Sequence, residues 1–303
     1  MAQKVSIALC TYNAGKYLLP LIESLLAQTI LPTEIVCCDD GSTDGTKQLL
    51  QQLQHQYPNS IKIHFNETNL GYIKNFEQCI KLCSNEFIAI ADHDDIWLPQ
   101  KIEKLLNGIG NSLLVCSDSI YMDADGNNMG KQISTRYNLV THPDPRSFAF
   151  SNCVWGHTAL LKRELLQYAF PIPDHAPYDI WLGFIAASVS SVAYVDEPLT
   201  FWRQHSHSYT AKNFGNESKP ANQKYKDWQE RLAWLQLLTA SKHNRFNPFM
   251  QELSDKYESK KDEFSWGLFL YLIKYNKVLF LFWRKNLLSK IIECRKMSRK
   301  VEQ

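Results

Sequence analysis

Residues 87–97, FIAIADHDDIW, combine a predicted central strand with an acidic loop. Its first half, Phe87 to Ala91, is an uninterrupted apolar run with the length of a strand buried on both faces. Three carboxylates, Asp92, Asp94 and Asp95, follow at once. Ligands of open parallel sheets bind beyond the carboxyl ends of the strands. We therefore expect these carboxylates at a ligand site that terminates a central strand.

On both sides of this run, short apolar segments alternate with helical patterns, which is typical of βαβ units. Leu18, Leu21, Ile22 and Leu25, for example, recur at helical spacing. The strands predicted in the first part of the chain are residues 5–9, 34–38, 61–65, 87–91 and 113–117. Further on, we expect helices at 160–168 and 179–188 and a strand at 192–195. The sequence predicts an α/β fold with a mostly parallel sheet flanked by helices.

The composition changes near residue 211. Residues 1–210 hold 14 Lys and Arg against 21 Asp and Glu, whereas residues 211–303 hold 19 against 10. The later part is rich in aromatic residues and helical in period, with Trp228, Leu232 and Leu235 on one stripe. We expect one domain over 1–210 and a helical, basic extension over 211–303.

The composition excludes disordered, collagen-like and low-complexity sequence. The chain has 303 residues, 45% of them hydrophobic and 21% charged, as in ordinary globular proteins. Its eight cysteines show no C-x-x-C pair, so we expect reduced, buried thiols in a cytoplasmic protein. We expect no signal peptide before the strand at Val5, and Lys274 and Lys277 interrupt the apolar stretch 264–283. We expect no transmembrane helix.

The loop after the second predicted strand begins with two adjacent carboxylates, Asp39 and Asp40. Ser42 or Thr43 would serve as a helix N-cap there. A cap does not require paired carboxylates, which repel each other unless a ligand or a positive group faces them, so we expect a ligand role for Asp39 or Asp40. An EF-hand loop is the competing interpretation, and it fails because Gln51 stands where a bidentate Glu is needed.

The phosphate-binding signatures G-x-G-x-x-G and G-x-x-x-x-G-K-[ST] are both absent from the sequence. The carboxylates at 92–95 offer another way to neutralise phosphates, because hard oxygen ligands collect a divalent cation that bridges to a diphosphate. A solvated acidic turn is the alternative.

Four segments together resemble the nucleotide-sugar-dependent glycosyltransferases of family 2, which have the GT-A fold. They are residues 6–13, 39–46, 69–75 and 92–101. The residues DHDDIW, then Pro99, Lys101 and Ile102, look especially like the bacterial rhamnosyltransferase-type branch. The resemblance covers roughly residues 4–210.

The resemblance implies roles for these positions. Asp92 and Asp94 would bind a divalent cation, Mn or Mg, and the donor diphosphate, while the role of Asp95 is open. His205, in the segment WRQH, would be a further metal ligand, ahead of His207 or His157. The residues expected around the nucleotide-sugar donor are Thr11, Tyr12, Asn13, Asp39 or Asp40, Asn69, Gly71, Asn75, Asp92, Trp155, Gly156 and His157.

The family's general base is an Asp that opens a helix in the second half of the domain, and Asp179 matches it. Tyr178 stands where this branch often has His, so the segment departs from the pattern. A helix N-cap is the plain structural interpretation of Asp179, and a carboxylate can hold both roles. Trp155 could likewise stack on a sugar or belong to the core.

The resemblance implies an inverting, metal-dependent glycosyltransferase that acts on a bacterial polysaccharide or a lipid-linked acceptor. A dTDP-rhamnose donor is favoured. A UDP-hexose transferase of the same fold, a nucleotidyltransferase and a non-catalytic sugar-binding relative are the alternatives. The basic, aromatic C-terminal segment suits contact with the inner face of the cell membrane, or else a helical cap, and nucleic acid is not an expected partner.

Overall fold

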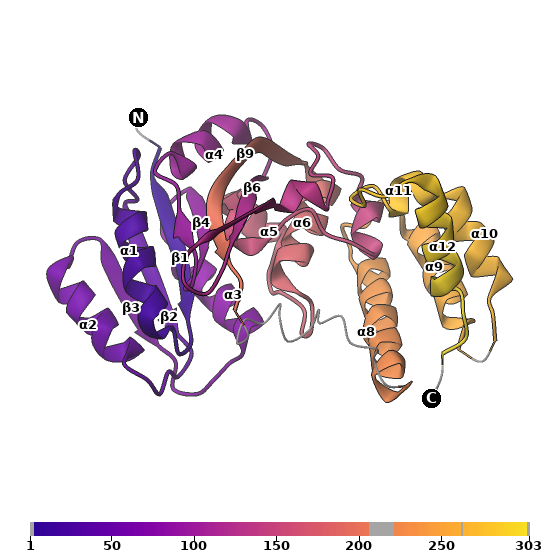
Figure 1. The fold of residues 1–303 in the computed structure, drawn as a ribbon, viewed down its shortest axis with the longest axis horizontal. Helices are drawn as coiled ribbons and strands as arrows, with labels where there is room; N and C mark the ends of the chain where they lie inside the picture. The colour runs from indigo at the N-terminus through magenta and orange to yellow at the C-terminus, as the bar shows by residue number, and fades with distance from the viewer. Residues whose placement is uncertain (1–2, 206–220, 262, 302–303) are drawn as a thin grey trace. The chain divides into compact units, whose positions relative to one another are not determined.

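The computed structural model describes residues 3–205, 221–261 and 263–301 (Figure 1). The chain forms two compact units. The first comprises Met1–His142 and Cys153–Ser206, and the second comprises Pro143–Asn152 and His207–Gln303. The expected domain boundary at 210/211 lies outside the described residues. The second unit also takes up residues 143–152, which no composition shift indicates.

Four parallel strands form one half of the sheet in the first unit: β1 (Val5–Thr11), β2 (Glu34–Asp39), β3 (Ile61–Phe65) and β4 (Phe87–Asp92). Their order is β3-β2-β1-β4. Thr11 pairs with Asp39 on β2, and Cys10 pairs with Asp92 on β4. This register brings the carboxyl ends of three strands to one edge, where the polar loops begin.

The other half of the sheet is mixed in direction. It contains β5 (Ile96–Trp97), β6 (Leu114–Met122), β7 (Asn128–Gln132), β8 (Ala159–Lys162) and β9 (Val192–Arg203). Strand β8 lies antiparallel between β4 and β6, whereas β6 and β9 are parallel. The expectation of a mostly parallel sheet therefore holds for β1 to β4 and not for this half.

The helix expected over 160–168 is wrong at its start. Leu160 and Leu161 belong to β8, where both are fully buried. An apolar run of this length does not distinguish a buried strand from a buried helix. Helix begins only at Arg163, as a short 3₁₀ turn that leads into α5 (Leu166–Ala169).

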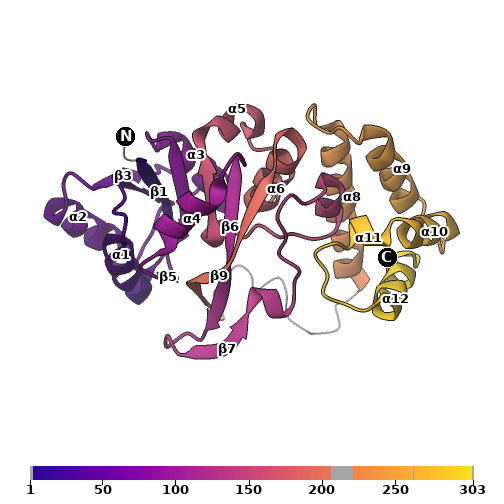
Figure 2. The ribbon, with the colours of Figure 1, turned by 90° about the horizontal axis from the view of Figure 1, so that it is seen from above.

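The remaining helices of the first unit are α1 (Leu18–Leu26), α2 (Thr46–Gln56), α3 (Tyr72–Leu82), α4 (Lys101–Ile109) and α6 (Tyr178–Val189). Short 3₁₀ turns occur at 15–17, 133–135 and 156–158. Helices α1 and α4 cover one face of the sheet, and α3 and α6 cover the other (Figures 1 and 2).

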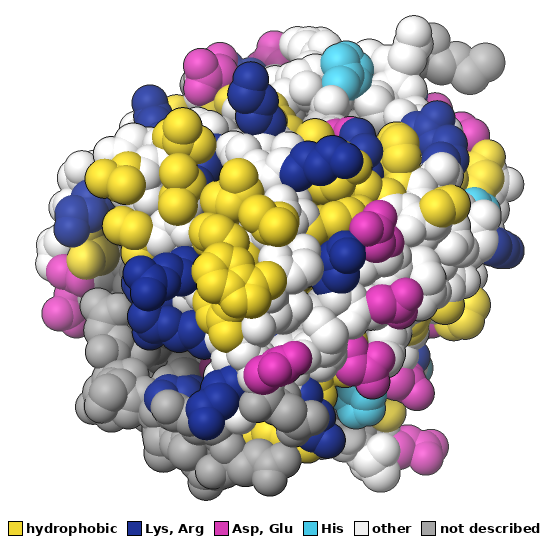
Figure 3. Space-filling view, turned by 90° about the vertical axis from the view of Figure 1, so that its right-hand side faces the viewer, with side chains coloured by type: hydrophobic (Ala, Val, Ile, Leu, Met, Phe, Trp, Pro, Cys, Tyr) yellow, Lys and Arg dark blue, Asp and Glu magenta, His cyan; other side chains and the backbone are white. Residues whose placement is uncertain are grey.

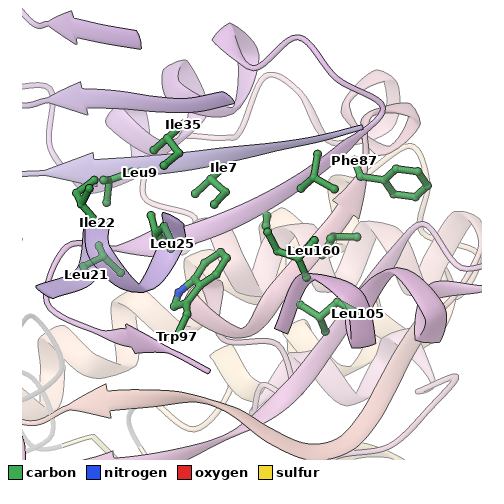
Figure 4. Close-up of a cluster of buried hydrophobic side chains, with 14 of the residues drawn as sticks. Ile7, Leu9, Leu21, Ile22, Leu25, Ile35, Phe87, Trp97, Leu105 and Leu160 are labelled. Carbon is green, nitrogen blue, oxygen red and sulfur yellow. The ribbon is translucent and has the colours of Figure 1, made fainter. Parts of the chain in front are cut away.

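The main core lies between the sheet and the helices α1 and α4 (Figure 4). Alternate residues of β1, Ile7 and Leu9, point into it and meet Leu21 and Leu25 of α1. Each such side chain contributes about 1.5–3 kcal/mol by leaving water. On the opposite face, the Cys79 thiol of α3 donates to the Val36 carbonyl at 3.2 Å. All eight cysteines are free and buried, as expected.

The second unit is helical within its described residues. It contains a 3₁₀ helix at Pro145–Ala149 and α8 (Ala221–Ala240), α9 (Asn247–Glu258), α10 (Trp266–Lys274), α11 (Asn276–Leu279) and α12 (Leu287–Met297). The stripe Trp228, Leu232 and Leu235 on α8 is buried, as its period predicts. The indole of Trp234 donates to the Phe148 carbonyl at 3.0 Å, which joins residues 143–152 to α8.

Candidate functional site

A hydrogen-bond network around Asp39 links the carboxyl ends of β1 and β2. Its carboxylate is fully buried and accepts from the Thr11 hydroxyl and the Ser42 backbone N–H, both at 2.9 Å. The Ser42 hydroxyl accepts from the Asn13 N–H at 2.8 Å. Asn13 in turn accepts from the Thr43 N–H at 2.9 Å, which binds the two loops together. The Tyr12 side chain between them stays half-exposed.

Asp40 anchors the loop that follows β3. Its carboxylate accepts from the Asn66 amide at 2.8 Å and from the N–H groups of Leu70 and Gly71 at 2.7 and 2.9 Å. The Asn69 amide adds a hydrogen bond to the Asp40 carbonyl. The donors that the paired carboxylates require therefore come from the protein itself. The premise that Asp39 and Asp40 need a ligand for stability is wrong.

Asn75 is a buried part of the same framework. Its side-chain amide donates to the Cys38 carbonyl at 3.1 Å and accepts from Asn66 at 3.0 Å. Asn69 and Gly71, by contrast, are exposed at the edge, and Gly71 adopts a positive φ of 78° just before α3. Thus Asn69 and Gly71 lie where a ligand can reach them, and Asn75 holds the loop through its buried hydrogen bonds to Asn66 and Cys38.

The end of β4 carries a cluster that could hold a metal ion. Potential ligand atoms of Asp92, Asp95 and His157 all lie within 4.8 Å of one another. His157 faces Asp92 through Nδ1, and its Nε2 is 2.8 Å from the Ser119 hydroxyl. Burial, with help from Lys101, lowers the pKa of His157 to about 3, so the imidazole is neutral and able to ligate. Burial and the neighbouring Asp94 and Asp179 raise the pKa of Asp92 to about 7.

Asp94 and His205 form a separate pair, with Oδ2 and Nε2 2.8 Å apart. Burial opposes ionisation of Asp94, but the His205 hydrogen bond holds its pKa below the usual range. Arg203 fixes the acidic loop that contains Asp94 and Asp95. Its Nε donates to the Asp94 carbonyl at 2.7 Å, and its backbone N–H donates to the Asp95 carboxylate at 2.9 Å. His207 lies outside the described residues.

Lys101 is fully buried behind the acidic loop, an unusual position for a lysine. Its ammonium donates to the His157 carbonyl at 2.5 Å and to the Thr200 hydroxyl at 2.8 Å, and lies 3.5 Å from the centre of the Trp97 ring. Burial lowers the pKa of Lys101 well below its usual value, although Asp95 and Asp92 oppose this shift. Lys101 thereby ties β9 to the turn that carries His157.

Asp179 lies in the first turn of α6, and its charge is one of the causes that raise the pKa of Asp92 at the end of β4. Tyr178, beside it, is buried and stacks on Phe76 with ring centres 4.3 Å apart. Gly156 fits against this tyrosine, because a Cβ at position 156 would lie 1.8 Å from the Tyr178 hydroxyl. Gly156 is thus required for space.

Trp155 is partly buried and packs edge-on against Tyr137, with ring centres 5.2 Å apart. It belongs neither wholly to the core nor to the open surface.

Sequence reasoning missed the parts played by Arg203, Ser119 and Thr200 and the full burial of Asp95. These contacts depend on β9 returning beside β6, and a local pattern does not encode that pairing. The one available signal was Lys101, a lysine placed at a position that a helical period assigns to the core.

Comparison with protein families identifies the chain. The model of glycosyl transferase family 2 matches residues 6–170, more than half of its length. The chain belongs to this family. An uncharacterized glycosyltransferase of Nostoc sp. is 30% identical over 211 residues, which is 67% of this chain and 65% of that protein. Chondroitin synthase of Escherichia coli is 35% identical over 136 residues, which is 44% of this chain and only 19% of the synthase.

Solved structures agree on the GT-A fold. S. aureus TarS 1–349 in complex with UDP-GlcNAc has a TM-score of 0.61 at 16% identity, over 91% of this chain and 82% of that one. A mannosyltransferase of Pyrobaculum calidifontis in complex with GDP-Man and Mn²⁺ has a TM-score of 0.54 at 15% identity, over 84% and 69% of the two chains. These likenesses confirm the expected fold.

Proposed function

We propose that this family 2 protein is an inverting, metal-dependent glycosyltransferase that moves a sugar from a nucleotide-sugar donor to a hydroxyl group of a glycan or lipid-linked acceptor. The observation that carries the proposal is the contact between Tyr178 and Gly156, which places Asp179 at the start of α6 beside the turn that holds His157 of the acidic cluster. Inversion requires a base on the face of the sugar opposite the departing diphosphate. The base and the diphosphate-binding site must therefore lie near each other, with the sugar between them.

Asp179 takes the proton of the acceptor hydroxyl as the new glycosidic bond forms. The position suits a carboxylate base, because the N–H groups at the start of α6 stabilise negative charge. One of them, on Ile180, already donates to Asp179 at 2.8 Å. Tyr178 and Gly156 hold the start of the helix against the turn that carries His157. The Asp179 carboxylate is therefore held in place before the acceptor arrives.

The donor set fits a divalent cation. Asp95 Oδ2 is a buried oxygen with no hydrogen-bond partner among the described residues, beside a second carboxylate and a neutral imidazole. A catalytic ion also needs a coordination position open to its substrate. Asp92, Asp94 and His205 keep some exposure, whereas Asp95 and His157 have almost none. In this proposal Asp92 of the cluster is one ligand, and Asp94 and His205, which form a separate pair in this structure, supply the other two. Mn²⁺ or Mg²⁺ bound there would stabilise the charge of the departing diphosphate.

The nucleoside end of the donor is assigned to the edge formed by β1 and β2. Asp39 and Thr11 form its floor, and Tyr12, Asn13, Asn69 and Gly71 offer accessible groups around it. The segment of Trp155, Gly156 and His157 lines the sugar side in this proposal, with Trp155 partly exposed and Gly156 and His157 buried behind it. Asp40 and Asn75 act by shaping the loop, since their polar atoms already have partners.

The donor is proposed as dTDP-rhamnose from the branch resemblance, with UDP-hexoses as the competing class. The TarS structure holds UDP-GlcNAc and the Pyrobaculum enzyme holds GDP-Man, so the fold accepts more than one nucleotide. We place the enzyme in the cytoplasm, extending a bacterial surface polysaccharide or its precursor. No helix among the described residues is long and apolar enough to cross a membrane.

A donor panel tests the proposal. Purified protein is incubated with dTDP-rhamnose and with common UDP- and GDP-sugars, and release of nucleoside diphosphate is measured with Mn²⁺, with Mg²⁺ and with EDTA. We expect slow hydrolysis of one donor that requires the metal. A protein that hydrolyses no donor and is not stabilised against heat by any of them would contradict the proposal and indicate a non-catalytic relative.

A further inference from the structure

Helix α10 in the second unit is apolar on both of its sides. Its inward side buries Leu268, Tyr271 and Leu272. Its outward side carries Trp266 and Leu270, which are 67% and 62% exposed and lie one turn apart. A helix on the surface of a globular unit normally presents polar residues to water, so an apolar outward side indicates a surface that meets another apolar phase.

Helix α12 continues this apolar surface. It packs against α10, and the Ser265 N–H just before α10 donates to the Ser298 carbonyl just after α12 at 3.0 Å, so the two helices run in opposite directions. Leu287, Leu288 and Ile292 of α12 are 62%, 67% and 48% exposed. Figure 3 looks onto this end of the unit and shows hydrophobic side chains gathered in a patch, with Lys and Arg side chains and some Asp and Glu side chains around it.

Positive charge predominates in the segment that carries the patch. Residues 264–301 contain nine Lys and Arg and a single acidic residue, Glu293. Glu293 already lies within 3.5 Å of Lys285 and 3.2 Å of Lys296. Lys274 ends α10, and Arg295 and Lys296 stand in the last turn of α12, all exposed. A protein partner of ordinary composition would not require this excess of positive charge, whereas an anionic lipid surface complements it.

We propose that the outward side of α10 and α12 is a membrane-docking surface that inserts Trp266, Leu270, Leu288 and Ile292 into the headgroup region of an anionic bilayer. The basic residues of 274–300 remain at the level of the lipid phosphates. Tryptophan and leucine on the apolar side, with Lys and Arg around them, are the composition of helices that lie in the membrane interface. This inference concerns a lipid surface and does not depend on which sugar the enzyme transfers.

Vesicle sedimentation of the full chain, without any nucleotide sugar, tests this surface. We expect binding to vesicles of equimolar phosphatidylcholine and phosphatidylglycerol, weaker binding at high salt, and little binding to pure phosphatidylcholine. The double variant Trp266→Ser/Leu270→Ser should bind the anionic vesicles at least about tenfold more weakly. The matched control is Leu31→Ser in the first unit, which removes an equally exposed leucine (64%) and should bind as the wild type does.

Thermal unfolding of each variant separates loss of folding from loss of binding, since exposed residues are replaced and Tm should stay unchanged. Should the double variant not fold, Leu288→Ser/Ile292→Ser takes its place. The proposal is overturned if the wild-type protein does not bind anionic vesicles, or if a folded double variant binds them as the wild type does. It is also overturned by a wild-type dimer that Trp266→Ser dissociates without any vesicle binding, because the surface is then an interface between copies.

Discussion

Gly156 and Tyr178 are in contact so close that no side chain larger than hydrogen fits at position 156: an added Cβ would lie 1.8 Å from the tyrosine hydroxyl and 2.7 Å from its Cζ. The contact joins the 3₁₀ turn that holds His157 to the first turn of α6, where Asp179 lies. Two segments with proposed roles in one reaction are thus placed by a single packing contact between residues that have no chemistry of their own.

Gly156→Ala should therefore lower turnover more than it lowers stability. The added methyl group displaces Tyr178 and with it Asp179, and a shift of about 1 Å in a catalytic group costs up to roughly a hundredfold in rate. We expect kcat to fall at least about tenfold, measured as diphosphate release with saturating donor. Gly45→Ala is the control, because nothing lies within 4 Å of a Cβ there. Equal rates for the two variants would contradict this account.

The proposed metal ligands are tested by titrating Mn²⁺ into variants by calorimetry. Asp94→Asn and His205→Gln should each weaken binding at least about tenfold, since even outer partners of a metal site cost that much. Asp125→Asn, which changes an exposed aspartate, is the control and should bind normally. If Asp95→Asn and His157→Gln abolish binding while the Asp94 and His205 variants retain it, the ion lies in the buried cluster and our ligand assignment fails.

Asp40→Ala should destabilise the first unit. The change leaves three donors, from Asn66, Leu70 and Gly71, without their acceptor, and we expect the free energy of unfolding to fall by about 2–4 kcal/mol. Asp174→Ala removes an aspartate from an exposed ion pair with Lys74 and should change the free energy of unfolding much less. Urea denaturation measures both values. Similar losses would show that Asp40 does not anchor the loop.

Acid sensitivity should depend in part on Glu34. Burial disfavours its charged form, but hydrogen bonds from Lys62, Ser6 and Ser84 outweigh this and lower its pKa to about 2. A folded-state pKa below the usual 4.5 means that this stabilisation is fully present above about pH 4.5 and is lost as the pH falls toward 2.

Glu34→Gln should therefore lower the free energy of unfolding near neutral pH by about 1–3 kcal/mol, with the gap to wild type narrowing as the pH falls through this range. Urea denaturation at several pH values measures the gap. Glu67→Gln, which changes an exposed glutamate, should show no such gap. A gap that stays constant down to the lowest pH would refute the linkage.

The half of the fold that follows local rules was predictable. Strand β3 has the expected bounds, and β1, β2 and β4 extend one or two residues further, to Thr11, Asp39 and Asp92. The parallel ladder carries these polar residues into the strand ends, because their backbone groups still pair with the neighbouring strand. Parallel topology alone then brings the polar loops together at one edge.

The other half depends on pairing between distant segments. Strand β8 was expected as a helix, and β9 continues to Arg203, eight residues beyond the expected end. That continuation delivers Arg203 and His205 to the loop at Asp94 and Asp95. The argument from charge repulsion at Asp39 and Asp40 failed for the same reason, because the compensating N–H groups of Leu70 and Gly71 come from another loop.

Asp179→Asn, assayed with donor and Mn²⁺, shows whether Asp179 is the base of a glycosyl transfer. We expect diphosphate release to fall by about a hundredfold or more, the usual contribution of a general base, while the affinity for the nucleoside diphosphate is unchanged. An Asp179→Asn variant that turns over the donor at the wild-type rate would remove Asp179 from the mechanism.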